Sequence, residues 1–158
     1  MLTGDKIETA KCIAIATGMV RKNDVVHEIR GDQGLLEMSG ELRNLELKSL
    51  IEAYAKSNKQ SAMLMIDGIA LSRIMASQEL TTRFFSAAVG AKSVCVCRCS
   101  PTQKAQVARH IREYSGKRIA CVGDGGNDVA MIQEADVGLG IVGKEGKQAA
   151  LASDFSLT

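Results

Sequence analysis

The chain has 158 residues and a formal net charge of +2, because 20 basic residues nearly balance 18 acidic ones. This balance gives no overall field that would favour nucleic acid or an anionic membrane as a partner, and only 3% of the residues are aromatic, which argues against a stacking platform for bases. No stretch reaches the ~18 consecutive apolar residues of a membrane span and the N-terminus lacks the apolar core of a signal peptide, so we expect a soluble piece, one domain long.

Helical spacing of apolar residues alternates along the chain with short apolar runs. The expected elements are a helix over 5–18, a strand over 24–30, a helix over 42–57, a strand over 61–67, helices over 70–75 and 78–89, a strand over 92–98, a helix over 101–116, a strand over 118–123, a helix over 127–135, a strand over 136–141, a helix over 144–153 and a strand over 154–157. A glycine-punctuated loop or hairpin is expected over 31–40. The alternation predicts an α/β fold with a mainly parallel sheet flanked by helices.

Capping residues mark several helix ends. Asp5 followed three residues later by Glu8 is a variant of the capping box, and Gly18 is suited to end that first helix. Pro101, the only proline, can open the helix that Gly116 then ends.

The five cysteines are an odd number and show no C-x-x-C spacing, which fits reduced, intracellular thiols. Cys95, Cys97 and Cys99 alternate, so on a strand they would share one face. We interpret them as small core residues, and the alternative is a metal or redox role.

Two aspartates, Asp124 and Asp128, lie four residues apart just after a predicted strand, with glycines between them. Open α/β sheets bind ligands at the carboxyl ends of their strands. Two neighbouring carboxylates repel unless a cation lies near them, and Mg²⁺ is suited to this place because it takes one or two carboxylates and leaves its other positions to water and phosphate oxygens. The alternative is a glycine-rich turn in which Asp124 or Asn127 is only a cap.

Two other residues shift the balance toward phosphate chemistry. Lys104, one turn into a helix that follows a strand, can bring a positive charge to a phosphate, although a single such lysine is more often a solvated surface residue. Thr3 offers a hydroxyl and backbone amides at a helix N-terminus. Asn127 can donate a hydrogen bond to the same phosphate. Together these residues predict Mg²⁺ held against a phosphoryl group.

Three stretches, LTGDK, CRCSPTQK and GDGGNDVAMIQEADVGLGI, resemble the phosphorylation domain of P-type ATPases in the haloacid dehalogenase-like superfamily. NDVAMIQ and GKEGKQAALASDFSL are similar to the phospholipid-flippase branch, and EGKQA followed by DFS is similar to its Neo1-like subgroup. The resemblance implies a haloacid dehalogenase-like Rossmannoid fold and a single, partial phosphorylation domain over 1–158. It covers the whole chain and is weakest over 32–59.

The resemblance also implies functional roles for the residues of this chain that match the family's motifs. The residues matched to ATP or phosphate contacts are Thr3, Gly4, Asp5, Arg98, Lys104, Asn127 and Asp128, and those matched to Mg²⁺ are Asp124 and Asp128. Thr3, Lys104 and Asp124 match residues of the catalytic centre. On spacing alone, Arg98 could also be a charge at a strand end.

The family's nucleophile, the aspartate of Asp-Lys-Thr-Gly-Thr, occurs nowhere in these 158 residues. Asp67 lacks that context and is interpreted as part of a strand-end turn. We therefore expect a downstream part of a larger pump, without its nucleophile strand and with unpaired strand edges. As an isolated chain it should rearrange, pair with a second copy or be only marginally stable.

The resemblance implies a fragment of an ATP-driven phospholipid flippase at the cytosolic face of a membrane, with Mg²⁺ as cofactor and ATP as substrate. Its partners would be a phospholipid, bound by the absent membrane domain, and an accessory beta-type subunit, which the family allows. Two alternatives stay open: a stand-alone phosphatase of the same superfamily and a non-catalytic module that binds Mg²⁺ or a nucleotide. The isolated chain should not turn over ATP.

Overall fold

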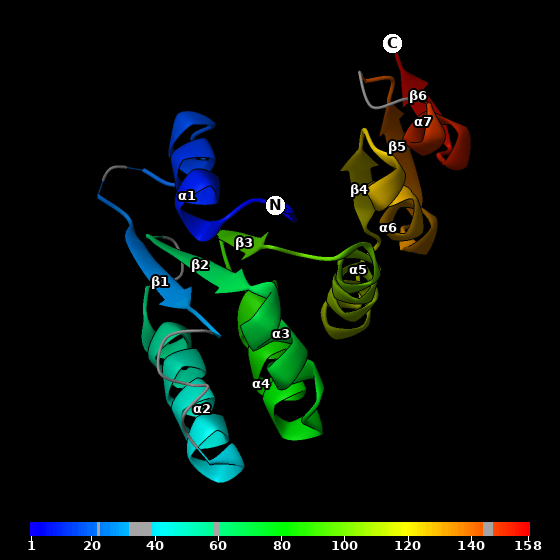
Figure 1. Ribbon diagram of the computed structural model, residues 1–158. Coiled ribbons are helices and arrows are strands. Elements are labelled where there is room, and N and C mark those ends of the chain that lie inside the picture. Colours follow the sequence, from blue (N-terminus) through cyan, green and yellow to red (C-terminus); the bar gives the residue numbers. More distant parts are fainter. Residues whose placement is uncertain (22, 32–38, 59–60, 144–146) are drawn as a thin grey trace. The chain divides into compact units, whose positions relative to one another are not determined.

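The computed structural model describes residues 1–158 except 22, 32–38, 59–60 and 144–146. The chain forms two compact units, Met1–Cys99 and Ser100–Thr158, which are described separately (Figure 1). Most of the loop expected over 31–40 and the start of the helix expected over 144–153 lie outside the described residues.

The first unit contains a parallel sheet in the order β1-β2-β3. Its elements are α1 (Ile7–Ala16), β1 (Val25–Ile29), α2 (Gly40–Lys56), β2 (Ala62–Asp67), α3 (Gly68–Met75), α4 (Gln78–Val89) and β3 (Ser93–Cys97). All six residues of the central strand β2 are buried. This is why its sequence is a continuous apolar run and not an alternating one.

Helices cover both faces of this sheet. In Figure 1, α1 lies above it and α2, α3 and α4 lie below it. The core on the α1 side joins three buried residues of that helix to the buried side chains of Met63, Met65, Cys95 and Cys97. Cys95 and Cys97 are therefore core residues, as predicted, and Cys99 is buried as well.

The first helix begins later than its expected capping box. Its N-cap residue is Lys6, which makes no side-chain capping bond. The capping-box prediction is therefore wrong, because the Asp5 carboxylate accepts a hydrogen bond from Thr3 and the Glu8 carboxylate is bound to Arg30. Gly18 adopts a φ of 73°, which confirms its predicted place at the end of this helix.

The outer edge of β3 is paired with the start of the chain. Leu2 forms a parallel bridge to Val96, the Thr3 amide donates to the Val96 carbonyl at 2.9 Å, and the Val96 amide donates to the Met1 carbonyl at 2.9 Å. The β3 edge is therefore paired in part by the start of the chain. Among the described strands, β1, β4 and β6 each pair with a single neighbouring strand, so unpaired edges are present, as expected.

The second unit contains another parallel sheet, in the order β4-β5-β6. Its elements are α5 (Pro101–Ser115), β4 (Ala120–Gly123), a short 3-10 helix η1 (Gly126–Asp128), α6 (Val129–Glu134), β5 (Val137–Ile141), α7 (Gln148–Ala152) and β6 (Phe155–Leu157). A capping box formed by Ser100 and Gln103, with Pro101 in the first turn, starts α5, and Gly116 ends it with a φ of 61°. Both predicted ends of this helix are confirmed.

The α/β class and the parallel pairing agree with the prediction, but the strands form two three-stranded sheets and not one. This arrangement is consistent with a haloacid dehalogenase-like Rossmannoid fold. Within the described ranges, no helix has both the length and the apolar character needed to cross a membrane.

Candidate phosphate and magnesium site

The two aspartates of the carboxylate loop lie in different environments. β4 ends at Gly123, and the loop continues through Asp124 and Gly125 into η1. Asp124 is exposed, whereas Asp128 is only 6% exposed. Gly123 is required here because an added Cβ would lie 2.3 Å from the Asp128 Cβ atom. The close approach of strand and helix turn therefore depends on this glycine.

Asp128 is bound on both of its carboxylate oxygens. Oδ1 accepts from the Lys104 Nζ at 2.7 Å, and the two side chains are 9% and 6% exposed. Oδ2 accepts longer hydrogen bonds from the amides of Asp124, at 3.3 Å, and Gly125, at 3.4 Å. The structure thus places a positive charge, the ammonium group of Lys104, beside Asp128, whereas the charge argument had named Mg²⁺ as the cation near the two carboxylates.

Asp124 remains the open carboxylate of the loop. No described side chain forms an ion pair with it, and Gly143 lies beside it, since an added Cβ there would lie 3.5 Å from the Asp124 Cβ atom. Asn127 is exposed in the same loop. An open carboxylate and an open amide at the carboxyl end of a parallel strand can bind a hydrated cation and a phosphate oxygen.

In the first unit, the segment Thr3–Asp5 is held against the end of β3. The Thr3 hydroxyl donates to the Asp5 carboxylate at 3.0 Å and accepts from the Asp5 amide at 3.1 Å. The Cys99 amide donates to the Thr3 carbonyl and the Arg98 amide to the Asp5 carbonyl, both at 2.9 Å. These bonds bring together four of the predicted residues: Thr3, Gly4, Asp5 and Arg98.

Arg98 has a backbone conformation that is unusual for a residue other than glycine. Its φ is 48°, and its side chain is exposed. Strained residues of this kind concentrate at functional sites. Arg98 lines a small pocket of about 50 Å³ with Ile7, Glu8, Arg30 and Asp67. Arg30 and Asp67 come from the carboxyl ends of β1 and β2, so three successive strands contribute to this pocket.

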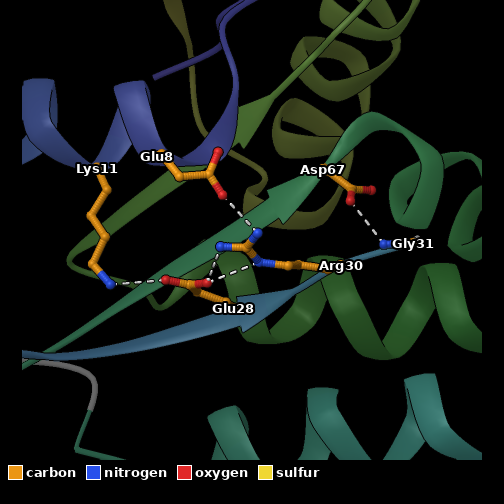
Figure 2. A network of polar contacts seen from close by, with 6 residues as sticks. All are labelled: Glu8, Lys11, Glu28, Arg30, Gly31 and Asp67. Carbon is orange, nitrogen blue, oxygen red and sulfur yellow. Dashed lines mark hydrogen bonds and ion pairs between the residues drawn. The ribbon is translucent and has the colours of Figure 1, made fainter. Parts of the chain in front are cut away.

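A network of ion pairs joins α1 to β1 beside this pocket (Figure 2). Arg30 donates to Glu28 at 2.7 and 3.0 Å and to Glu8 at 2.8 Å, and Lys11 donates to Glu28 at 2.9 Å. Burial acts to raise the pKa of Glu28, but the bonds from Lys11 and Arg30 together outweigh it and lower that pKa. Asp67 is not part of this network: it caps α3 through the Ala70 amide and accepts from the Gly31 amide, as a strand-end turn should.

Sequence reasoning missed this network, although a signal was present. Glu28 and Arg30 are two residues apart on a predicted strand, and Glu8 and Lys11 are three apart on a predicted helix. Each pair therefore presents both of its charges on one face. The sequence did not show that these two faces meet.

The chain is similar in sequence to known proteins over its whole length. No protein-family model matches the chain. The chain is 48% identical over 158 residues to the phospholipid-transporting ATPase NEO1 of Saccharomyces cerevisiae, 43% identical over 157 residues to neo1 of Schizosaccharomyces pombe, and 42% identical over 158 residues to the probable phospholipid-transporting ATPase IIB of Homo sapiens. The chain matches one segment of the phospholipid-transporting P-type ATPases, and it is Neo1-like. It spans 13–14% of the length of these curated relatives, and 99–100% of the chain is aligned.

The donor set of the carboxylate loop fits Mg²⁺ bound together with a phosphate and does not fit a closed metal centre. Among the described residues, no group of three or more His, Cys, Asp or Glu side chains could hold a metal ion. Mg²⁺ needs only one or two carboxylates when phosphate and water supply its other ligands. Asp124 is open to such a cation, whereas both oxygens of Asp128 already have partners.

Proposed function

We propose that this chain forms part of the phosphorylation domain of a phospholipid-transporting ATPase, the part that holds Mg²⁺ and the phosphoryl group. The observation that supports this most directly is the exposed Asp124 next to the buried pair of Lys104 and Asp128, at the carboxyl end of β4. The match to phospholipid-transporting ATPases over the whole chain supports the same function.

Each residue of the carboxylate loop has a distinct role in this proposal. Asp124 ligates Mg²⁺, and the amide of Asn127 donates to a phosphate oxygen. Lys104 supplies a positive charge. Asp128 holds the Lys104 side chain in position, so that this side chain does not have to be ordered when the phosphate binds. When bound, Mg²⁺ would neutralise negative charge on the phosphoryl oxygens.

The first unit would contribute contacts to ATP. Thr3, Gly4 and Asp5 offer a hydroxyl, backbone amides and a carboxylate, and the exposed guanidinium of Arg98 can pair with a phosphate oxygen. Their mutual hydrogen bonds hold them in one arrangement before ATP binds. This preorganisation would reduce the entropic cost of binding.

The rest of the longer protein would complete the function. The nucleophilic aspartate that accepts the phosphoryl group, the membrane helices that move the phospholipid and any contact with a beta-type subunit would lie outside these 158 residues. The segment itself would work at the cytosolic face of the membrane, where ATP is available. Without its nucleophile, the isolated chain would at most bind Mg²⁺ and nucleotide.

The test uses the full-length protein and measures the Mg²⁺ concentration that gives half-maximal phosphorylation by ATP. We expect Asp124→Asn to raise this concentration at least about tenfold. The loss of a ligand that contributes ~1.4 kcal/mol or more to Mg²⁺ binding weakens that binding by this factor. Glu113→Gln, an exposed carboxylate on α5, is the matched control and should leave it unchanged. An unchanged Mg²⁺ requirement in Asp124→Asn would refute the assignment.

A further inference from the structure

The start of α7 lies at the same end of the second sheet as the carboxylate loop. The parallel register aligns Gly123, the last residue of β4, with Gly140 near the end of β5. An added Cβ at Gly140 would lie 2.5 Å from the Ala149 carbonyl oxygen, so the first turn of α7 packs directly on this end of β5. Figure 1 shows α7 beside β5. The carboxyl ends of neighbouring parallel strands form the edge at which such sheets bind ligands, so residues that follow β5 share this edge with the carboxylate loop.

Two of the residues that follow β5 lie against the carboxylate loop. An added Cβ at Gly143 would lie 3.6 Å from the Asp124 Oδ2 atom. An added Cβ at Gly126 would lie 3.9 Å from the Cβ and 4.0 Å from the Cγ of Gln148. Gly143 is therefore beside the proposed Mg²⁺ ligand. Gln148 is instead beside Gly126, the residue that precedes Asn127, and Asn127 is the proposed phosphate contact.

The side-chain amide of Gln148 is available for a ligand. Gln148 is the first residue of α7 and is exposed. In the part of the chain that the structure describes, its amide has no hydrogen-bond partner. Its Cβ and Cγ lie beside Gly126, and the amide extends beyond them. A glutamine amide offers N–H donors without a charge, which suits a phosphate oxygen better than a cation.

We propose that the Gln148 amide donates a hydrogen bond to a phosphate oxygen held at the carboxylate loop. The loops that follow β4 and β5 would then each supply an amide to the phosphoryl group, from Asn127 and from Gln148. Hydrogen bonds to an anionic oxygen are stronger than those between neutral groups. This inference rests on the proposed function, because it needs a phosphoryl group beside the Mg²⁺ that Asp124 ligates. Gln148 would strengthen phosphate binding and leave Mg²⁺ binding almost unchanged.

The test uses the full-length protein and orthovanadate, a mimic of phosphate. Gln148→Met keeps the Cβ and Cγ beside Gly126 and removes the amide. We expect it to raise the orthovanadate concentration that halves ATP hydrolysis by about tenfold, in line with one lost hydrogen bond to a charged group. The Mg²⁺ concentration for half-maximal phosphorylation should change less than about twofold. Gln133→Met, at an exposed glutamine of α6, is the matched control and should change neither value.

A second variant tests the sign of the interaction. Gln148→Glu keeps the shape of the side chain but places a negative charge where the proposal puts a donor to an anion. It should therefore raise the half-inhibiting orthovanadate concentration further than Gln148→Met does, because the two negative charges repel each other. A smaller effect of Gln148→Glu than of Gln148→Met would contradict a contact between this side chain and phosphate.

An unchanged response to orthovanadate in Gln148→Met would overturn the proposal. An equal rise in its Mg²⁺ requirement would overturn it as well, since that result indicates a distorted loop and not a lost phosphate contact. Asp124→Asn, measured in parallel, separates this failure from a failure of the proposed function. If Asp124→Asn raises the Mg²⁺ requirement and Gln148→Met changes nothing, only the role of Gln148 is refuted. If neither variant has an effect, the Mg²⁺ site is refuted too.

Discussion

Lys104 and Asp128 lie in contact at 2.7 Å with little exposed surface, so both charges are largely shielded from bulk water. A buried pair of this kind contributes little net stability, but removal of one partner leaves an uncompensated charge in the interior. The site thus combines a closed pair with an open carboxylate at Asp124. The closed pair holds the lysine in place, and the open carboxylate is free to bind the cation.

This closed pair leads to a prediction about coupling between its two members. Lys104→Met and Asp128→Asn should each lower the free energy of unfolding of the chain by about 3–5 kcal/mol, because each leaves a buried group without its partner. In the double variant, the loss in free energy of unfolding should be smaller than the sum of the losses in the two single variants. Urea unfolding of the four proteins measures this coupling, and strictly additive losses would show that the two charges do not depend on each other.

At the scale of elements, the ion pairs of Figure 2 attach α1 to β1 and thereby support the Thr3–Asp5 segment that leads into α1. The pKa of Glu28 is lower in the folded chain than its ordinary value of 4.5. The stability that its ion pairs contribute is therefore present above pH 4.5 and is lost as the pH falls through the lowered, folded-state pKa.

We expect Glu28→Gln to lower the free energy of unfolding at pH 7 by about 1 kcal/mol, in line with partly exposed ion pairs. The difference from the unsubstituted chain should shrink as the pH falls below 4.5 and vanish below the lowered folded-state pKa, where the carboxylate is protonated in both states. Glu113→Gln serves as the control and should change stability little at any of these pH values. A deficit in Glu28→Gln that stays constant down to low pH would rule out this electrostatic role.

Most elements could be predicted because their signals are local. Pro101 and Gly116 mark the ends of α5, and the unbroken apolar run of β2 indicates a strand buried on both faces. The pair of Lys104 and Asp128 could not be predicted, since its members are 24 residues apart and the charge argument assigned the cation near the two aspartates to Mg²⁺. The division into two sheets was missed for a related reason: periodicity locates strands but does not say which edges pair.

At the scale of the whole molecule, the two sheets differ in completeness. The first has a helical layer on each face, and its β3 edge is paired by Leu2. The second exposes apolar side chains of β4, β5 and β6 and has no described strand paired to the outer edge of β4 or of β6. Exposed apolar surface and an unpaired edge both promote association. The expectation that the isolated chain pairs with a second copy, rearranges or is marginally stable therefore stays a prediction, and these two features of the second unit are its physical basis.

The most direct test of the central claim is an NMR titration of the 158-residue chain with Mg²⁺, followed through its backbone amides. The account predicts saturable shift changes centred on Asp124–Asn127, which Asp124→Asn abolishes while the signals of α5 and α6 stay in place. If Asp124→Asn leaves these shift changes intact, or if they centre on residues away from the carboxylate loop, the chain does not hold Mg²⁺ in the way proposed here.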